Sequence, residues 1–393
     1  MLDFDTLIAP IGREKFLRDH WNVSFARMKG TPGRFADLID WEELNAILAN
    51  QRLTAPRLRL YKDGKAIDPA RYTTPAALGP QRVDSGGLAV ALAEGATLVL
   101  TDAQDASAKL RALMQVFQEV LHTGAFVNLY AAWHPQSAFN LHWDPQDTII
   151  LQVSGRKRWK VYKPTRLHPL EFDLETPEEP KGEPVWSGIL NDGDALYVPR
   201  GWWHSVVALN EPSLHLSVSI TPPKCLDFLA RAITKLRSET VVRADLAALK
   251  DKDTRAAQIR ALHAALVSAL SEDAMDEFLR QWEGDISHAP HIDLLGAAYG
   301  QFSTIDSNTR LRLASLHRLT LVPYGDIFEF KAANRMWTVP RALAPALSRL
   351  QNAHATSVAE LTALLPSDAD REILLKSLAV LARSGVVLID RQP

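Results

Sequence analysis

The sequence predicts an α+β protein in which a closed antiparallel β structure is followed by helical regions. Residues 125–220 consist of short alternating runs separated by Gly, Pro and Asp, a pattern typical of strands and turns. After residue 222 the composition changes to helices rich in Leu, Ala and Arg. A chain of 393 residues is also too long for a single hydrophobic core. We therefore expect three parts, residues 1–222, 223–290 and 291–393.

The first 124 residues are expected to form an extension that mixes helices with short strands. Residues 58–62 alternate as a half-buried strand does, and an Asp-Gly turn signal follows them. Residues 107–123 have apolar side chains at helical spacing, and Gly124 is placed to end that helix.

Short strands dominate the next hundred residues. We expect them at residues 126–130, 148–153, 158–162, 195–198 and 214–220. Such a series favours a double-stranded β-helix, that is, a jelly-roll or cupin barrel. Small barrels of this type direct inward side chains towards one ligand site.

Three side chains of this β domain, which we call the metal triad, have a pattern typical of metal sites. His142 and Asp144 are two residues apart, so they would share a face if the segment were a strand. His204 follows a tight Pro-Arg-Gly turn, 60 residues after Asp144. Two histidines and one carboxylate leave positions open on a metal, as in non-haem Fe(II) oxygenases. A single histidine is more often structural, but the motif G-D-x-L-x-x-P-x-G-x-x-H over 193–204 favours a ligand set.

Lys157 gives an independent indication of a ligand. Alternation over residues 156–162 places Lys157 on one face with Trp159 and Val161, whereas the remaining cations of this run are interpreted as solvated. A buried ammonium needs a partner, and a bound dicarboxylate would provide one.

Further polar side chains share the inward parity of their strands. Asn128 and Tyr130 form one such pair, and His215 and Ser217 form another. We assign all four, with Lys157, as candidate cofactor-binding residues. For His215 and Ser217 a structural hydrogen-bond network is an alternative of nearly equal weight.

The remainder of the chain is expected to contain helices and one final strand. A capping box at 357–360 begins one helix, and a second begins near Ser367 and ends at Gly385 before a strand. Helix, helix and strand at a chain end are compatible with a small winged-helix module. From residue 330 onward there are eight basic and five acidic residues, a net of +3, which is too weak a bias to favour DNA binding over a structural role.

One predicted helix has an apolar stripe that is wider than a lone surface helix needs. The stripe consists of Leu226, Phe228, Leu229, Ile233 and Leu236. It predicts a homodimer built through the helical region, and packing against the barrel of the same chain is the alternative.

Composition limits the other partners and the compartment. The net charge of −2 implies no general attraction to nucleic acid or membranes. Cys225 is the single cysteine, which excludes an internal disulfide framework and suits a reducing cytosol. Neither a signal peptide nor an apolar run of about 18 to 20 residues, the length that spans a bilayer, is present. We expect a soluble, cytoplasmic protein.

The sequence resembles the JmjC-type Fe(II)/2-oxoglutarate oxygenases of the cupin superfamily, and specifically the ribosomal oxygenase subgroup. The resemblance rests on Asn128-Leu-Tyr130, His142-Trp-Asp144 and the motifs at residues 151–162 and 193–204. Their order and spacing match over residues 125–220. The flanking regions match only in layout, since that subgroup has a helical dimerisation domain and a C-terminal winged helix.

The resemblance implies an Fe(II) ion held by the metal triad, with 2-oxoglutarate and O2 as cosubstrates. Lys157 would pair with the distal carboxylate of 2-oxoglutarate, and Asn128 and Tyr130 would lie beside the cosubstrate or the substrate. Members of the subgroup hydroxylate side chains of ribosomal proteins. The expected function is therefore hydroxylation of a protein or peptide side chain, most plausibly in a ribosomal protein.

Several alternatives remain open from the sequence. A biosynthetic peptide is a second candidate substrate, and N-methyl demethylation is a second reaction. A cupin metalloenzyme of another kind would need no Lys157, and a non-catalytic binding or regulatory protein would give the winged helix the main role. Trp202 and Trp203 favour a peptide if at least one lies at the barrel mouth, although packing within the barrel explains them almost equally well.

Overall fold

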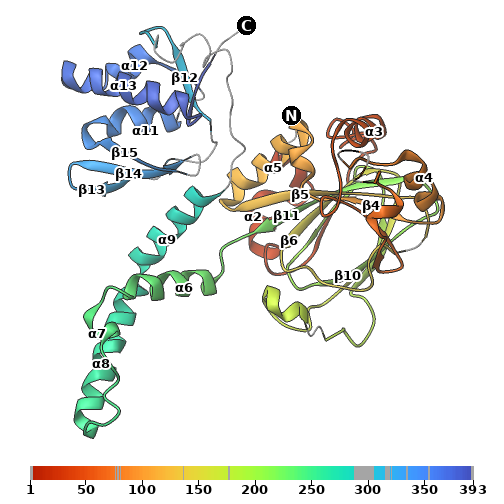
Figure 1. The fold of residues 1–393 in the computed structure, drawn as a ribbon, viewed down its shortest axis with the longest axis horizontal. Coiled ribbons are helices and arrows are strands. Elements are labelled where there is room, and N and C mark those ends of the chain that lie inside the picture. The colour runs from red at the N-terminus through yellow and green to blue at the C-terminus, as the bar shows by residue number, and fades with distance from the viewer. Residues whose placement is uncertain are drawn as a thin grey trace. The chain divides into compact units, whose positions relative to one another are not determined.

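The chain folds into two compact units, residues 1–222 and 223–393, each described here by itself (Figure 1). The computed structural model describes residues 3–75, 77, 79, 81–135, 137–175, 178–286, 305–314, 319, 321–332, 335–352 and 355–390. The predicted boundary between residues 290 and 291 lies outside these residues. Within them, no helix is long and apolar enough to cross a membrane.

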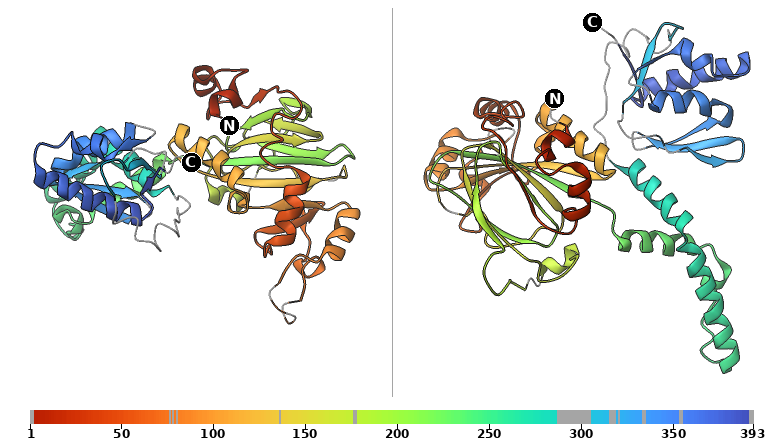
Figure 2. Two further views of the ribbon diagram at one scale, coloured as in Figure 1. Left: turned by 90° about the horizontal axis from the view of Figure 1, so that it is seen from above. Right: turned by 180° about the vertical axis from the view of Figure 1, so that it is seen from behind.

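Two antiparallel sheets form the first unit. Among the described residues the large sheet has the order β1-β9-β6-β11-β5-β4-β2-β3, and the small sheet has the order β10-β7-β8. The strands are β1 (Ala26–Met28), β2 (Leu58–Lys62), β3 (Lys65–Ala66), β4 (Thr97–Leu100), β5 (Gly124–Ala132), β6 (Asp147–Ser154), β7 (Lys157–Tyr162), β8 (Trp186–Leu190), β9 (Ala195–Val198), β10 (Trp203–Ala208) and β11 (Ser213–Thr221). This is the double-stranded β-helix that the sequence predicts, and Figure 2 shows its strands from two further directions.

Helices of the N-terminal extension pack on one face of the large sheet. They are α1 (Phe4–Ile8), α2 (Arg13–Asp19), α3 (Trp41–Asn50), α4 (Ser85–Ala93) and α5 (Ala108–Leu121). The prediction that α5 ends at Gly124 is wrong. His122 takes the left-handed conformation at the end of α5 with a φ of 50°, and Gly124 is already the first residue of β5.

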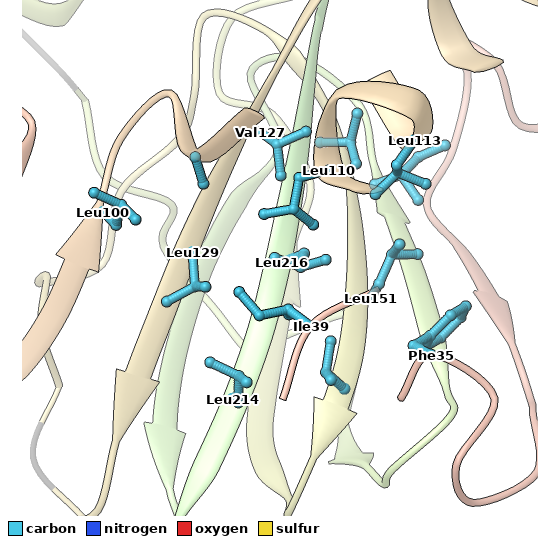
Figure 3. Close-up of a cluster of buried hydrophobic side chains, with 14 of the residues drawn as sticks. Phe35, Ile39, Leu100, Leu110, Leu113, Val127, Leu129, Leu151, Leu214 and Leu216 are labelled. Carbon is cyan, nitrogen blue, oxygen red and sulfur yellow. The ribbon is translucent and has the colours of Figure 1, made fainter. Parts of the chain in front are cut away.

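Alternation along β5 and β11 divides apolar from polar side chains. Leu129 of β5 pairs with Leu216 of β11, and both side chains are buried in the core beneath the helices. Figure 3 shows them gathered with Val127 and with Leu110 and Leu113 of α5. Because successive residues of a strand point to opposite faces, the polar residues between these positions face the interior of the barrel.

The second unit begins with helices and ends with two small sheets. The helices are α6 (Cys225–Leu236), α7 (Thr240–Arg243), α8 (Lys252–Ala269), α9 (Glu272–Asp285), α11 (Ala344–Asn352), α12 (Val358–Thr362) and α13 (Asp368–Arg383). The sheets have the orders β16-β12-β17 and β13-β14-β15. Their strands are β12 (Arg310–Leu313), β13 (Val322–Tyr324), β14 (Ile327–Ala332), β15 (Arg335–Pro340), β16 (Thr356–Ser357) and β17 (Val387–Ile389).

The C-terminal helices begin where the sequence predicts. The Ser357 hydroxyl accepts a hydrogen bond from the Glu360 backbone N–H, and the Glu360 carboxylate accepts one from the Ser357 backbone N–H. The predicted capping box is therefore formed. Ser367 caps α13, and Gly385 follows that helix with a φ of 71° before β17 begins. These helices and the β16-β12-β17 sheet contribute to a separate apolar core.

Candidate active site

The metal triad is assembled from two connections of the barrel. The expectation that His142 and Asp144 lie on a strand is wrong, because both lie in the segment that connects β5 and β6. A single β-bridge joins His142 to His204 at the start of β10. His142 donates its backbone N–H to the His204 carbonyl at 3.2 Å, and His204 returns a bond of 2.7 Å. This bridge, rather than strand alternation, holds the two histidines together.

The ligand atoms of the triad converge on one point. Nε2 of His142 is 3.9 Å and Nε2 of His204 is 3.6 Å from the Asp144 carboxylate. One ligand atom from each residue lies within 4.8 Å of the others. The buried Trp143 between the first two ligands is only 6% exposed. Two imidazoles and one carboxylate thus form the donor set of a facial metal site.

The second nitrogen of each imidazole fixes the ring for metal binding. Nδ1 of His142 lies 2.8 Å from the Asn140 carbonyl, and Nδ1 of His204 lies 3.2 Å from the Trp202 carbonyl. A proton on each Nδ1 donates to that carbonyl, which leaves Nε2 free to bind a cation. Burial, with the nearby His142, lowers the pKa of His204 to about 4, so the ring is neutral near neutral pH. The residues therefore fit a divalent metal ion.

Buried acids that the sequence analysis missed hold the loops around the triad. Asp147 accepts from the Tyr197 hydroxyl at 2.7 Å and from the backbone N–H of Arg200 at 3.3 Å, which anchors the turn before His204. In that turn Gly201 has a φ of 81°, and its N–H donates to the Asp144 carbonyl at 3.0 Å. A side chain at Gly201 would be strained in this backbone conformation.

Asp194, within the same sequence motif, is structural. Its carboxylate accepts from the Gly30 N–H at 3.0 Å, the Asn191 N–H at 3.2 Å and the Arg27 guanidinium at 3.0 Å. Burial alone would raise the pKa of this carboxyl, but these bonds hold it below its ordinary value. In the sequence, the only indication of this structural role was that Asp194 is a polar residue among apolar neighbours of the motif. Asp194 therefore braces the start of β9 against β1 and the loop that follows it.

Lys157 lies inside the barrel, as its strand parity predicts. It is 3% exposed, and burial lowers the pKa of its amine to about 7. Its Nζ lies 2.8 Å from Nδ1 of His215. Among the residues that the structure describes, no carboxylate pairs with Lys157. The opposite face of β7 is solvated, since Arg158 and Lys160 are exposed.

The other predicted polar residues divide into two groups. Tyr130 and Ser217 line the same cavity as Lys157 and the triad. The ring of Tyr130 stacks on His215 with centroids 4.7 Å apart, and burial raises the pKa of its hydroxyl. Asn128 does not line the cavity. Its Oδ1 accepts a hydrogen bond from the Asp102 N–H at 3.4 Å.

The aromatic residues at the cavity differ from those expected. Trp203 is 1% exposed and donates its Nε1–H to the Thr165 hydroxyl at 3.0 Å. Trp202 packs near Phe25, with centroids 5.8 Å apart. Neither lines the cavity, so barrel packing explains both. Phe139, which the sequence analysis did not single out, lines the cavity beside His142 with a centroid distance of 5.5 Å.

The cavity measures about 190 Å³ and opens between the two sheets. It is lined by Thr97, Tyr130, Ala132, Ser137, Ala138, Phe139, His142, Asp144, Thr148, Ile150, Lys157, Trp159, Val198, His204, Val206, Ala208, His215 and Ser217. It therefore combines a metal donor set with a buried amine in one cavity. The fold is that of a cupin barrel, and the donor set in its cavity fits one metal ion.

Residues 99–228 match the family model described as the JmjC domain. This segment includes the metal triad, Lys157 and His215. These residues are thus similar to a JmjC domain, as their sequence motifs predict.

Curated relatives match over about half of the chain. The proteins called bifunctional lysine-specific demethylase and histidyl-hydroxylase NO66 of Drosophila persimilis and Drosophila pseudoobscura pseudoobscura are each 30% identical over 220 residues. The alignments cover 54% of this chain but only 31% and 22% of those proteins. The chain thus spans less than a third of the length of either relative.

Solved structures match over nearly the whole chain. YcfD, a ribosomal oxygenase from Escherichia coli in complex with cobalt and succinic acid, aligns with a TM-score of 0.59 and 19% identity. The alignment covers 96% of this chain and 98% of YcfD. A YcfD structure with cobalt and 2-oxoglutarate aligns with the same TM-score and identity. The fold is therefore shared with a ribosomal oxygenase.

Proposed function

We propose that this chain is an Fe(II)- and 2-oxoglutarate-dependent oxygenase that hydroxylates a side chain of a protein or peptide. One observation carries the proposal: the metal triad and the buried Lys157, which has no carboxylate partner among the described residues, line one cavity. A metal donor set alone would fit many cupins. A 2-oxo dicarboxylate needs both a metal to chelate and a cation for its far end.

The residues of the chain have separate roles in this proposal. The metal triad would hold Fe(II), and Lys157 would bind the distal carboxylate of 2-oxoglutarate. Trp159 and Val206 line the cavity between them and exclude water. Bound Fe(II), 2-oxoglutarate and O2 supply the oxidising chemistry, in which one oxygen atom enters succinate and the other enters the substrate, with release of CO2.

The cavity favours a target side chain without a positive charge. Among its described lining residues Asp144 is the only carboxylate, and in this proposal it would bind the metal. A cationic side chain would find no anionic partner there, whereas Tyr130, Ser137 and Phe139 suit a neutral polar or aromatic group. The name of the NO66 relatives includes histidyl hydroxylase, and the YcfD structures are those of a ribosomal oxygenase. A histidine of a ribosomal protein is therefore the first candidate.

We expect the protein to add 16 mass units to one ribosomal-protein peptide. The test treats ribosomes from cells that lack this protein with the Fe(II)-loaded enzyme, 2-oxoglutarate and air, and then compares peptides by mass spectrometry. The Asp144→Ala variant is the matched control. A loss of 14 mass units with release of formaldehyde would replace hydroxylation by demethylation. If no ribosomal peptide changes while a small biosynthetic peptide does, the ribosomal assignment is wrong.

We also propose that the chain forms a homodimer through the helical region from about residue 225 to 283, with α6 in the interface. In the single chain Leu226, Leu229 and Ile233 of α6 are 50%, 42% and 58% exposed, so this part of the apolar stripe is uncovered. Leu236 is 7% exposed, and Phe228 packs near Phe278 with centroids 5.5 Å apart. A large exposed apolar stripe is typical of an interface between subunits.

Light scattering at micromolar concentration is expected to give twice the chain mass of 43.6 kDa. Ile233→Glu should shift the protein towards the monomer, because a charge in an apolar interface loses its hydration. The control is Leu167→Glu, which alters a residue that is 77% exposed in the first unit. A monomeric mass for the unaltered protein would refute the dimer.

A further inference from the structure

The contact between Lys157 and His215 has no role in the function proposed so far. The two residues lie on facing strands, β7 in the small sheet and β11 in the large sheet. Their side-chain nitrogens are 2.8 Å apart, although the residues are 58 positions apart in the sequence. Both are at most 5% exposed. Such a buried pair cannot hold two positive charges, because neither would have water or an anion to stabilise it.

A charged Lys157 must be the donor in this contact, because an ammonium has no lone pair with which to accept. A lysine nitrogen has hydrogens to donate in either protonation state, whereas Nδ1 of a neutral imidazole can accept. The pKa of His215 is held well below its ordinary value by burial and by Lys157, so its ring is neutral. The ring is also fixed in orientation, since Tyr130 stacks on it and Trp159 meets it edge-on with centroids 5.9 Å apart.

We propose that Lys157 and His215 form a proton-linked receptor for the distal carboxylate of 2-oxoglutarate, in which the cosubstrate binds together with one proton. His215 is a positioning residue that accepts a hydrogen bond from Lys157 and aims its nitrogen into the cavity. This inference rests on the function proposed above. The proton comes from solvent and converts the Lys157 amine to an ammonium, which then pairs with the carboxylate.

The surroundings of Lys157 favour the amine before the cosubstrate binds. The neighbouring strands place Leu190 of β8 and Ala208 of β10 beside it. The titratable groups that line the same cavity are Tyr130 of β5, His215 of β11 and the metal triad. Tyr130 stays neutral, and a divalent ion bound by one carboxylate adds a net positive charge to the cavity. The dicarboxylate is therefore the anion that this lysine lacks.

The protonation state of Lys157 decides how the Kd for 2-oxoglutarate changes with pH. Burial lowers the pKa of Lys157 to about 7, so well below that pH the side chain is an ammonium in the free protein. Binding then takes up no proton. Above that pH the amine must first be protonated, so the Kd for 2-oxoglutarate should rise about tenfold for each pH unit. Both carboxylates of the cosubstrate are ionised throughout this range.

Calorimetry of the Mn(II)-loaded protein tests the proposal. We expect 2-oxoglutarate binding to take up close to one proton at about pH 8.5 and a smaller number at lower pH, measured in buffers of different ionisation enthalpy. Pyruvate is the matched ligand, because it can chelate the same metal but has no distal carboxylate to reach Lys157. It should bind without proton uptake at either pH.

The variants separate His215 from a merely structural residue. His215→Phe keeps a ring for Tyr130 to stack on but removes the acceptor, so the pH at which the Kd begins to rise should fall. His215→Asn offers a side-chain oxygen near the position of Nδ1, so the Kd should again begin to rise at the same pH as in the wild type. In Lys157→Arg the guanidinium is always charged, so proton uptake should disappear.

Three results would overturn the inference. The first is wild-type binding of 2-oxoglutarate without proton uptake at high pH. The second is equal proton uptake with pyruvate, because the proton would then belong to the metal centre and not to Lys157. An unchanged pH profile in His215→Phe would show that His215 does not position Lys157. Failure of 2-oxoglutarate to bind at any pH would be a different result, because it would refute the proposed function itself.

Discussion

Replacing His142 or Asp144 with alanine is expected to abolish the formation of succinate from 2-oxoglutarate. Either change leaves two of the three ligands that converge within 4.8 Å, and two ligands hold Fe(II) poorly. Even changes behind the ligands of a metal site commonly cost about 10- to 100-fold in metal affinity or activity, so the loss of a ligand should exceed about 100-fold. Succinate yield and bound iron, measured on the same samples, check this prediction.

An exposed histidine provides the control for these variants. His263 lies in α8, outside the barrel unit, so His263→Ala should retain both iron and turnover. Circular dichroism and thermal unfolding would establish that the ligand variants remain folded. Turnover that survives in both His142→Ala and Asp144→Ala would show that the metal triad is misassigned.

Lys157→Ala is expected to raise the 2-oxoglutarate concentration needed for turnover while iron binding is retained. A hydrogen bond to a charged group contributes about 1.5 to 3 kcal/mol, which corresponds to roughly a tenfold to hundredfold loss of affinity. The fold should tolerate the change, because His215 is the one hydrogen-bond partner of this buried amine among the residues that the structure describes. Succinate formation as a function of 2-oxoglutarate concentration checks the affinity, and metal analysis checks the iron.

Lys160→Ala is the matched control for Lys157→Ala. Lys160 lies on the same strand but on the exposed face, three residues further along β7. Its removal should leave the 2-oxoglutarate requirement unchanged. Equal effects of the two variants would mean that the buried position of Lys157 has no special role, and the assignment of the distal carboxylate would then fail.

The sequence alone determined those features that depend on local patterns. Alternation in β7 was sufficient to place Lys157 on the buried face, and the capping box at Ser357 was sufficient to begin α12. The metal triad could be proposed from the sequence because the tight turn before His204 and the short strands around it restrict the direction of the His204 side chain. Each of these patterns lies within one segment of the chain, because hydrophobic periodicity and helix capping involve only residues that are close in the sequence.

Local pattern also misled where a connection, not a strand, positions the residue. His142 and Asp144 lie together because a β-bridge to His204 fixes their segment, and no alternation encodes that bridge. The sequence left Trp202 and Trp203 open between a binding surface and packing, but Trp202 packs against the apolar core between the two sheets and Trp203 is 1% exposed. Large aromatic side chains are driven to whichever apolar surface is nearest, and that surface depends on the fold.

Only the tertiary structure decided which polar residues meet inside the barrel. The parity of β11 turned His215 inward, but packing of the small sheet over the large sheet placed its Nδ1 2.8 Å from Lys157. Pairing of neighbouring strands within the large sheet brought Asn128 to the Asp102 N–H and Asp147 to the turn that holds His204. These contacts join residues far apart in the sequence, and their distances depend on how strands and sheets pack on each other. A periodic pattern specifies the face of a residue, whereas its partner across the barrel is specified by the packing of the whole fold.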